Sequence, residues 1–174
     1  MKKRVFVGFG VSDSLQKKIF SLQKKYKSLP VRWIDRKNLH ITLIPPWYTS
    51  DTNSVVLLLK KVRGMKGMTI VFEKVGFGPI RNRPRLIWAE SLAPNEILNL
   101  KTKIQKVLKK PGEKRKFTLH LTLARFRPEN FTIFPIKQLC EKVSWRQTLN
   151  SFCLYEAHLK RSGAEYKKLM EFKF

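Results

Sequence analysis

The sequence predicts an α+β protein built on antiparallel strands, and three observations support this fold class. Candidate strands and helices are mixed along the chain without the regular spacing of βαβ units. Two tight Pro/Gly turns favour antiparallel pairing. A weak internal repeat gives each half a strand, a helix and a second strand that carries histidine and threonine. The 174 residues suit one domain over 1–174, without a linker or a low-complexity segment.

In the first half, a strand is expected over Lys3–Phe9, followed by a helix capped by Ser12 or Asp13. Apolar residues recur in this helix at helical spacing: Leu15, Ile19, Leu22 and Tyr26. Asn38–Ile44 alternates strictly and predicts a strand that stops at Pro45-Pro46. A second helix is expected over Thr52–Val62, capped within Thr49-Ser50-Asp51.

In the second half, the apolar patterns predict the following elements. The strands are Met68–Val75, Leu86–Ser91, Phe117–Ala124, Gln147–Leu159 and Leu169–Phe174. One helix opens at Ala93-Pro94-Asn95 and ends before Pro111-Gly112, and another is expected near Ile136–Val143.

The charge balance is the strongest compositional signal. The chain has 37 Lys and Arg against 12 Asp and Glu, a net charge of +25, which attracts polyanions and argues against a cationic substrate. RNA, DNA and an anionic membrane surface all fit this charge, and so does a role in solubility alone. No apolar run approaches the length of a membrane span. We expect no membrane partner. Cys140 and Cys153 are expected to be reduced core thiols of a cytoplasmic protein.

Two of the three histidines lie in nearly the same pentapeptide, Leu39-His40-Ile41-Thr42-Leu43 and Leu119-His120-Leu121-Thr122-Leu123. Side chains alternate across a strand, so each copy presents an imidazole and a hydroxyl on one face and apolar side chains on the other. A single match of this length is weak, and a lone histidine on a strand is usually structural. Duplication with the same flanking positions favours a functional pair, whereas His158 lacks the threonine and is expected to be structural or on the surface.

The repeated motif indicates acid–base chemistry on a phosphate. Histidine titrates near pH 6.5, so near neutral pH one copy can accept a proton while the other donates one. The hydroxyls of Thr42 and Thr122 can donate to non-bridging phosphate oxygens. Two histidines without carboxylate or thiolate partners make a poor zinc site, so we expect neither metal nor other cofactor.

The chain resembles the two-histidine phosphoesterase superfamily, and within it the RNA 2′,3′-cyclic phosphodiesterases once called 2′-5′ RNA ligases. The resemblance runs nearly end to end. Besides the two motifs, it rests on these segments: Arg4-Val5-Phe6-Val7-Gly8-Phe9, Trp33, Gly76-Phe77-Gly78-Pro79, Arg83-Pro84-Arg85-Leu86-Ile87-Trp88, Ala124-Arg125, Leu154-Tyr155-Glu156, Gly163 and Tyr166. Two departures are Ile44-Pro45-Pro46-Trp47, where the family often has Phe-Leu-Gly, and Leu119, where it usually has proline.

The resemblance implies two pseudo-symmetric α+β lobes of antiparallel sheet with flanking helices around a central cleft, each supplying one His-x-Thr strand. It implies hydrolysis of an RNA terminal 2′,3′-cyclic phosphate to a 2′-phosphate, with His120 as the base and His40 as the acid. The sequence alone does not fix these two roles. Arg125 is similar to a family arginine that binds the phosphate, but a regular strand would point it away from His120. A bulge or a turn after Leu123 is needed to bring it in.

Two basic runs, Arg81–Arg85 and Lys114-Arg115-Lys116, suit contact with an RNA backbone and a solvated surface equally well. Trp33, Trp47, Phe77 and Trp88 are suited to stacking on bases, with the core preferred for Phe77 and Trp88. We expect no obligate protein partner and a monomer. Three rival functions stay open: a 2′-5′ RNA ligase using the same site, a basic RNA-binding protein without catalysis, and a hydrolase of small phosphodiesters.

Overall fold

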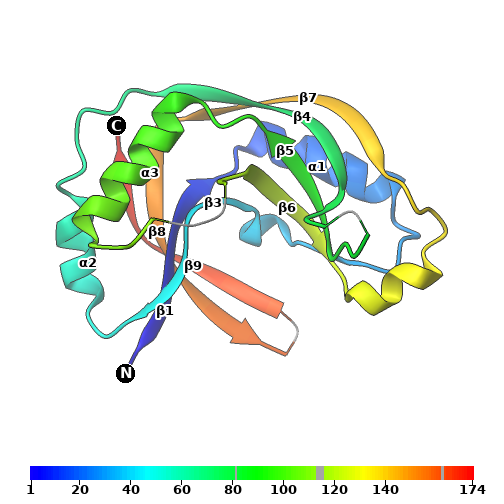
Figure 1. Cartoon of the computed structure of the whole chain (residues 1–174), viewed down its shortest axis with the longest axis horizontal. Coiled ribbons are helices and arrows are strands. Elements are labelled where there is room, and N and C mark those ends of the chain that lie inside the picture. Colours follow the sequence, from blue (N-terminus) through cyan, green and yellow to red (C-terminus); the bar gives the residue numbers. More distant parts are fainter. Residues whose placement is uncertain (81, 113–115, 162) are drawn as a thin grey trace.

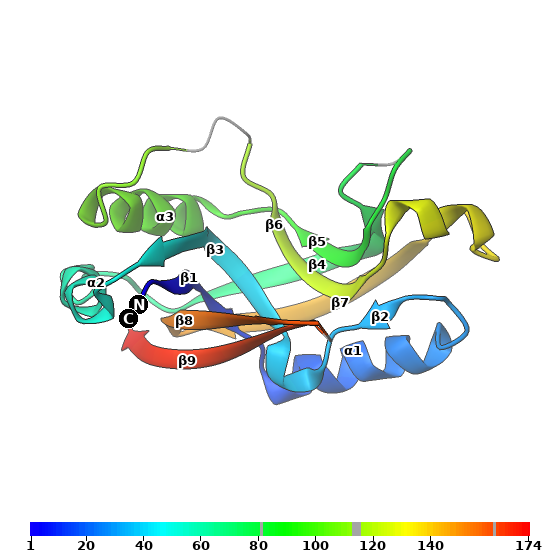
Figure 2. The ribbon, with the colours of Figure 1, turned by 90° about the horizontal axis from the view of Figure 1, so that it is seen from below.

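A single antiparallel sheet of nine strands forms the framework in the computed structural model, which describes residues 1–80, 82–112, 116–161 and 163–174. The strands are β1 (Lys3–Gly10), β2 (Arg32–Trp33), β3 (His40–Thr49), β4 (Met68–Gly78), β5 (Leu86–Ser91), β6 (Leu119–Arg125), β7 (Cys140–Leu149), β8 (Ser151–Lys160) and β9 (Gly163–Lys173). The helices are α1 (Asp13–Lys25), α2 (Thr52–Leu59) and α3 (Asn95–Val107), with short 3-10 helices η1 (Arg36–Asn38) and η2 (Pro128–Ile133). The curved sheet and its helices are seen in Figures 1 and 2.

The strand order is β7-β4-β5-β6-β3-β1-β8-β9, with β2 paired to β6, and every pairing is antiparallel. The sheet thus has two halves that meet where β3 runs beside β6. Only one pair of residues, Ile41 and Leu121, is in register across this seam. The expected α+β architecture of two lobes is therefore confirmed, with the two repeated motifs on the adjoining strands.

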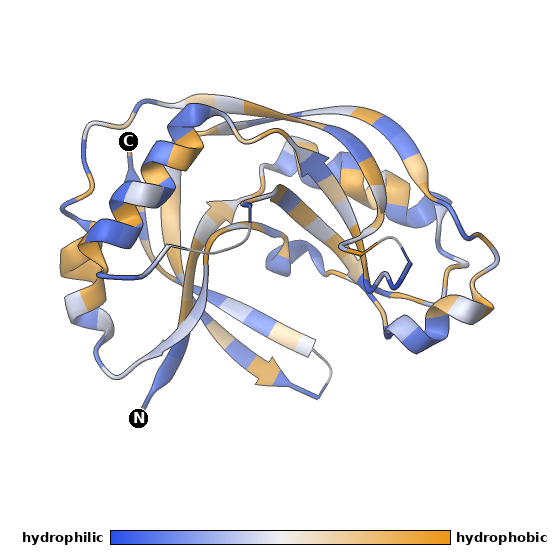
Figure 3. Ribbon diagram, viewed as in Figure 1, coloured by the Kyte–Doolittle hydropathy of each residue, from blue (hydrophilic) through white to orange (hydrophobic). Residues whose placement is uncertain are grey.

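Helices α1 and α3 each pack on the half of the sheet that does not contain the strand before them in the chain. Helix α1 follows β1 but contacts β7, where Lys25 and Tyr26 both bond to Glu141. Helix α3 follows β5 but contacts β3. These crossed helices cover a core whose centre includes Phe9, Ile41 and Leu121, all fully buried. Figure 3 shows hydrophobic residues concentrated in the strands and along the helices.

Strand β3 does not stop at Pro45-Pro46, as the sequence suggested, but continues to Thr49. The reason is an irregularity in its pairing with β1. Val7 lies opposite Ile44 and Val5 opposite Trp47, so the two prolines fall where the register shifts. Proline lacks the N–H that a regular ladder needs, but a bulge tolerates it.

The expected helix near Ile136–Val143 is wrong, since Cys140–Leu149 forms β7 along the edge of β4. The expected single strand over Gln147–Leu159 is also wrong, because the chain reverses at Asn150 between β7 and β8. The last strand begins at Gly163, earlier than expected, and runs the length of β8. Cys153 is buried as expected, whereas Cys140 is exposed at the start of β7; both thiols are free.

No helix in the described parts of the chain is long and apolar enough to cross a bilayer.

Candidate active site

The two His-x-Thr motifs lie on neighbouring strands and face the same way. Ile41 and Leu121 are directly opposite each other, and both are fully buried. Since side chains alternate along a strand, the flanking residues of both strands project from the opposite face. His40, Thr42, His120 and Thr122 therefore share one face, across strands spaced about 4.8 Å apart. All four are partly buried.

The orientation of the two imidazoles is fixed in the same way. Nδ1 of His40 lies 2.7 Å from the carbonyl oxygen of Asn38, and Nδ1 of His120 lies 2.8 Å from that of Thr118. A carbonyl oxygen can only accept, so Nδ1 carries the hydrogen in both rings. Nε2 is left with its lone pair when the ring is neutral. Each histidine therefore offers Nε2 as the atom that accepts or donates a proton.

His40 stands in an aromatic enclosure. The rings of Tyr166 and Phe6 lie 4.5 and 4.8 Å from it, and that of Tyr155 lies 6.5 Å away. Burial among these rings, with a smaller contribution from the positive charge of Arg125, lowers the pKa of His40 to about 4. In the free protein His40 is therefore neutral at physiological pH.

His120 has a different wall. Its ring lies 4.8 Å from that of Trp88, and burial lowers its pKa below the usual value. Trp88 sits close against Gly78, where a Cβ atom would come within 2.4 Å of the indole. Only glycine leaves room for this ring. The pKa values of both histidines lie below their usual range, and an anion bound between the two rings would favour the charged form of either.

Arg125 reaches the histidine face because β6 carries a bulge. Ile87 is opposite Ala124 and Trp88 opposite Thr122, so Leu123 has no counterpart on β5. Leu123 and Ala124 are both fully buried, which resets the alternation and returns Arg125 to the side of His120. The charge of Arg125 lowers the pKa of both histidines, consistent with its lying near both. The bulge that Arg125 needs in order to face the histidines is therefore present.

The same irregularity occurs in β3, where Gly8 is opposite Thr42 and Val7 opposite Ile44. Leu43 is thus the counterpart of Leu123, and Pro45 takes the place of Arg125. Only one of the two related positions carries a guanidinium. The site is pseudo-symmetric in its histidines and threonines but asymmetric in its positive charge.

Several residues of this face were not predicted from the sequence. Phe6, Tyr155 and Tyr166 enclose His40 from strands β1, β8 and β9. All three are among the residues that carry the family resemblance, but no role at the site could be assigned to them from the sequence. Arg32 is opposite Arg125 across the β2–β6 pairing. Burial lowers the pKa of Arg125, and the positive charges of Arg32 and Arg85 add to this effect. Glu90 is opposite His120 across the β5–β6 pairing. These partners depend on strand order, which no local sequence pattern reveals.

The remaining candidate residues lie outside this face or make other contacts. Trp88 is buried as expected, and Phe77 packs against Phe126, Phe131 and Phe134. Trp47 is covered by the amino group of Lys110 at 4.4 Å. His158 is exposed, with Nε2 3.6 Å from Glu156. Arg81, Lys114 and Arg115 lie outside the described residues. Among the described residues, no group of three or more His, Cys, Asp or Glu side chains is placed to hold a metal ion.

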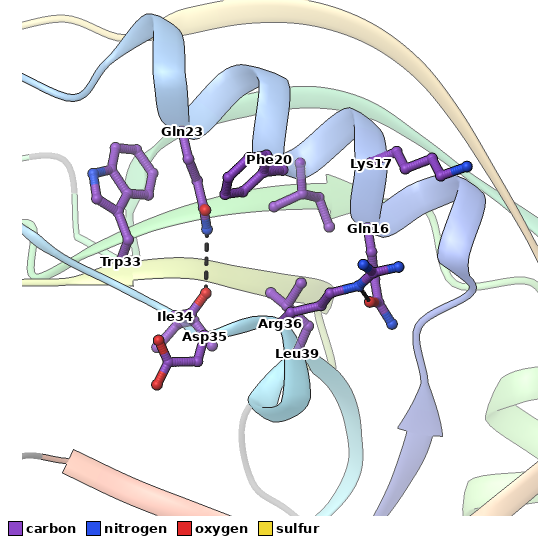
Figure 4. A pocket seen from close by; sticks show the side chains of 10 residues that line it. Gln16, Lys17, Phe20, Gln23, Trp33, Ile34, Asp35, Arg36 and Leu39 are labelled. Carbon is purple, nitrogen blue, oxygen red and sulfur yellow. Dashed lines mark hydrogen bonds between the residues drawn. The ribbon is translucent and has the colours of Figure 1, made fainter.

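Three cavities adjoin the region. One of 460 Å³ lies beside His40 and is lined by Tyr155, Tyr166, Lys168 and residues of η1. One of 640 Å³ includes Thr118 and Glu90, next to His120. A third, of 370 Å³, lies between α1 and the segment Trp33–Leu39; Figure 4 shows Gln23 bonded there to the carbonyl oxygen of Ile34. Neither histidine lines this third cavity.

Comparison with known proteins shows the family of the chain. The family model described as "2'-5' RNA ligase superfamily" matches residues 11–161. The chain belongs to this superfamily. A relative from Archaeoglobus fulgidus named RNA 2',3'-cyclic phosphodiesterase is 28% identical, covering 97% of this chain and 99% of its own.

Solved structures of other proteins share the fold of this superfamily member. E. coli LigT complexed with 3'-AMP matches with a TM-score of 0.81 at 20% identity, covering 100% of this chain and 99% of its own. TT0787 of Thermus thermophilus matches with a TM-score of 0.80 at 20% identity, covering 98% and 97% of the two chains.

Proposed function

We propose that this chain is an RNA 2′,3′-cyclic phosphodiesterase that opens a terminal cyclic phosphate to a 2′-phosphate. The observation that carries the proposal is the placement of four residues, His40, Thr42, His120 and Thr122, on one face of adjacent strands, with both Nδ1 atoms bonded to backbone carbonyls. The name of the Archaeoglobus relative supports the choice of substrate. The net charge of +25 suits an RNA.

The chemistry needs one base and one acid. One Nε2 takes a proton from water, whose oxygen attacks phosphorus, while the bond to the 3′ oxygen breaks. The other Nε2 donates a proton to that oxygen, so charge does not accumulate on the leaving group. Thr42 and Thr122 donate hydrogen bonds to the non-bridging oxygens, and Arg125 stabilises the negative charge that grows on them. These residues supply every step without a metal ion.

Product analysis tests this proposal directly. A short RNA ending in a 2′,3′-cyclic phosphate is incubated with the protein in excess EDTA, and the end group is identified. We expect a 2′-phosphate from the wild type, and a loss of turnover of at least about 100-fold in H40A and in H120A with RNA binding retained. H158A is the matched control and keeps wild-type activity. Unchanged turnover in H40A and H120A would leave a basic RNA-binding protein without catalysis as the explanation.

A ligase is the second candidate, because the family description names this reaction. The same site could run in reverse, joining the cyclic phosphate to the 5′-hydroxyl of another RNA. Water is far more abundant than RNA ends, so hydrolysis is expected to dominate. Adding a 5′-hydroxyl acceptor to the same assay separates the two reactions. A mostly joined product would identify the ligase.

A further inference from the structure

The cavity between α1 and the segment Trp33–Leu39 (the α1 cavity) has no part in the chemistry proposed above. Its volume of 370 Å³ falls within the range of sites that bind small organic groups. In Figure 4, Phe20 and Gln23 project from α1 toward it, and Trp33 lies on the segment that faces the helix. Aromatic and aliphatic side chains with an amide among them suit a flat ring that carries a few polar atoms. The charged residues of its lining are all exposed: Lys17, Asp35 and Arg36.

Phe20 leaves an aromatic ring open to solvent at the α1 cavity. Its neighbours on the helix, Ile19 and Leu22, are buried in the core, whereas Phe20 is 57% exposed. The amino group of Lys24 lies 4.9 Å from the centre of the Phe20 ring. Single-stranded nucleic acids bind to surfaces of this kind, where bases stack on aromatic rings and cations meet the backbone. The ring is therefore suited to stacking on a nucleobase.

The α1 cavity adjoins the cavity of 460 Å³ beside His40 (the His40 cavity). Gln16, Arg36 and Leu39 line both of them. Nε of Arg36 donates to the side-chain oxygen of Gln16, and Nη2 donates to Asp13 at 3.1 Å. The guanidinium thus joins η1 to α1 at the boundary between the two cavities, and it keeps further N–H groups for a ligand. A ligand anchored at His40 can therefore pass over Arg36 into the α1 cavity.

The charges on the two sides of the catalytic face differ. Among the described residues that line the His40 cavity there are three cations and no carboxylate. The cations are Arg36, Lys37 and Lys168, and their acidic partners outside the cavity are Asp13, Glu165 and Glu171. By contrast, the cavity next to His120 is lined by Glu73 and Glu90 as well as by two lysines. This difference favours an RNA chain that leaves the catalytic face past His40.

We propose that the α1 cavity binds the base of the penultimate nucleotide of the RNA, with the phosphodiester between the last two nucleosides on Arg36. The inference rests on the proposed function and defines which part of the RNA is recognised beyond the reacting end. The terminal nucleotide occupies the catalytic face, and the next base stacks on Phe20. The amide nitrogen of Gln23 donates to the carbonyl oxygen of Ile34 at 3.2 Å, which leaves the amide oxygen to accept from the base.

Two substrates with the same reacting end test this proposal. One is uridine 2′,3′-cyclic phosphate, and the other is the dinucleotide ApU that ends in the same cyclic phosphate. In the wild type, kcat/KM should be at least about tenfold higher for ApU, because stacking of one base on an aromatic ring contributes about that much. F20A should abolish most of this ratio. Y48A, which removes an aromatic ring that is 63% exposed on β3, is the control and should keep it. Equal ratios in F20A and Y48A would overturn the proposal.

An abasic dinucleotide shows whether Phe20 meets the base. It keeps the phosphodiester of ApU but has no base on the penultimate ribose. In the wild type it should react about as slowly as ApU does in F20A, and F20A should cause little further loss with it. If F20A reduced kcat/KM equally for ApU and for the abasic dinucleotide, the ring would not contact the base and the proposal would fail.

The phosphodiester contact is tested at Arg36. R36Q should lower kcat/KM about threefold to tenfold for both dinucleotides, and it should make their dependence on salt less steep by about one counterion. R63Q removes an equal charge from an exposed arginine after α2 and controls for the overall field of the protein. Equal effects of R36Q and R63Q would overturn the placement of the phosphodiester. Circular dichroism and the thermal midpoint check that each variant is folded.

A binding measurement keeps this inference separate from the proposed function. ApU with a terminal 2′-phosphate is added to saturation, and NMR is used to find nuclear Overhauser effects between its bases and the Phe20 ring. The adenine protons should show them. Effects from the uracil alone, or none from either base, would overturn the proposal. If the wild type opened neither cyclic phosphate, the proposed function would fail, whereas this measurement would still decide whether the cavity binds the base.

Discussion

The side-chain oxygen of Asn38 accepts a hydrogen bond from the backbone N–H of Tyr166 at 3.1 Å, while the carbonyl oxygen of the same asparagine accepts one from His40. Asn38 is buried and lies 128 residues before Tyr166 in the chain. One residue thus ties η1 to β9 and orients an imidazole and one of the rings that enclose it. The position of His40 depends on the docking of the last hairpin.

Replacing Asn38 by alanine leaves the N–H of Tyr166 without this partner and loosens the wall of His40. We expect N38A to lower the free energy of unfolding by about 1–3 kcal/mol in urea denaturation, because a broken buried hydrogen bond costs about that much. Turnover should fall as well. N99A removes an exposed asparagine of α3 and is the control, expected within about 0.5 kcal/mol of wild type. Equal stability of the two variants would contradict this role.

His40 should make the fold sensitive to acid. Its pKa is lowered to about 4, below the unfolded value of about 6.5, so the unfolded chain takes up a proton first as the pH falls. Stability is therefore lost between about pH 6.5 and 4 and is unaffected by this group above that range. Between pH 6.5 and 4.5, wild type should lose about 2 kcal/mol more than H40Q in urea denaturation. H158Q, at an exposed histidine, should show the same pH dependence of stability as the wild type. If H40Q also lost stability as steeply as the wild type, His40 would not be the source of the acid sensitivity.

Anion binding should draw protons into the site. A tetrahedral anion between the two rings favours their charged forms and raises both pKa values from their lowered positions. Sulfate is the appropriate probe because it does not titrate near pH 6. Calorimetry in buffers of different ionisation enthalpy should show uptake of protons at pH 6, reduced in H40Q. A binding enthalpy independent of the buffer would contradict the expectation.

The packing of Trp88 against His120 should require glycine at position 78. An alanine there would put its Cβ atom 2.4 Å from the ring of Trp88, which packs 4.8 Å from His120. We expect G78A to cost about 1–3 kcal/mol of stability by overpacking and to reduce turnover by displacing the indole. G112A is the control, because a methyl group added at Gly112 would meet no atom of the described residues within 4 Å. Wild-type turnover in G78A would show that the position of Trp88 does not matter.

The high positive charge should favour long RNA through its phosphates. KM for an RNA of about ten nucleotides is expected to rise steeply between about 50 and 200 mM salt, since each phosphate contact releases counterions. KM for a mononucleotide 2′,3′-cyclic phosphate should change little. Equal salt dependence of the two substrates would favour a hydrolase of small phosphodiesters.

The sequence predicted those parts of the site that depend on local alternation. His40 and Thr42, like His120 and Thr122, share a face because they are two residues apart on a strand. The fold class followed from the mixture of elements and their turns. Whether Arg125 faces the histidines depends on a bulge at Leu123. The sequence showed that such an irregularity was needed but did not show that it is present.

The parts that the sequence missed depend on which strands become neighbours. Tyr155 and Tyr166 meet His40 only because β8 and β9 lie beyond β1, and Glu90 meets His120 only because β5 lies beside β6. The reversal at Asn150 was missed because the residue after it is serine, and Asn-Ser is a weaker hairpin signal than Asn-Gly. The prolines of β3 suggested an end to the strand because proline lacks the N–H of a regular ladder. The bulge that accommodates them could not be predicted from the local sequence.

The seam between β3 and β6 has a consequence for the range of substrates. His40 and His120 lie diagonally across the pair Ile41 and Leu121. The spacing between strands and the rise along them are nearly constant among sheets, so the separation of the two histidine backbones is a property of main-chain hydrogen bonding and not of any loop. Such a separation suits any tetrahedral anion of similar size, whichever organic group it carries. Discrimination between substrates then falls to the flanking elements, and redesign there should alter selectivity while the proton-transfer machinery stays intact.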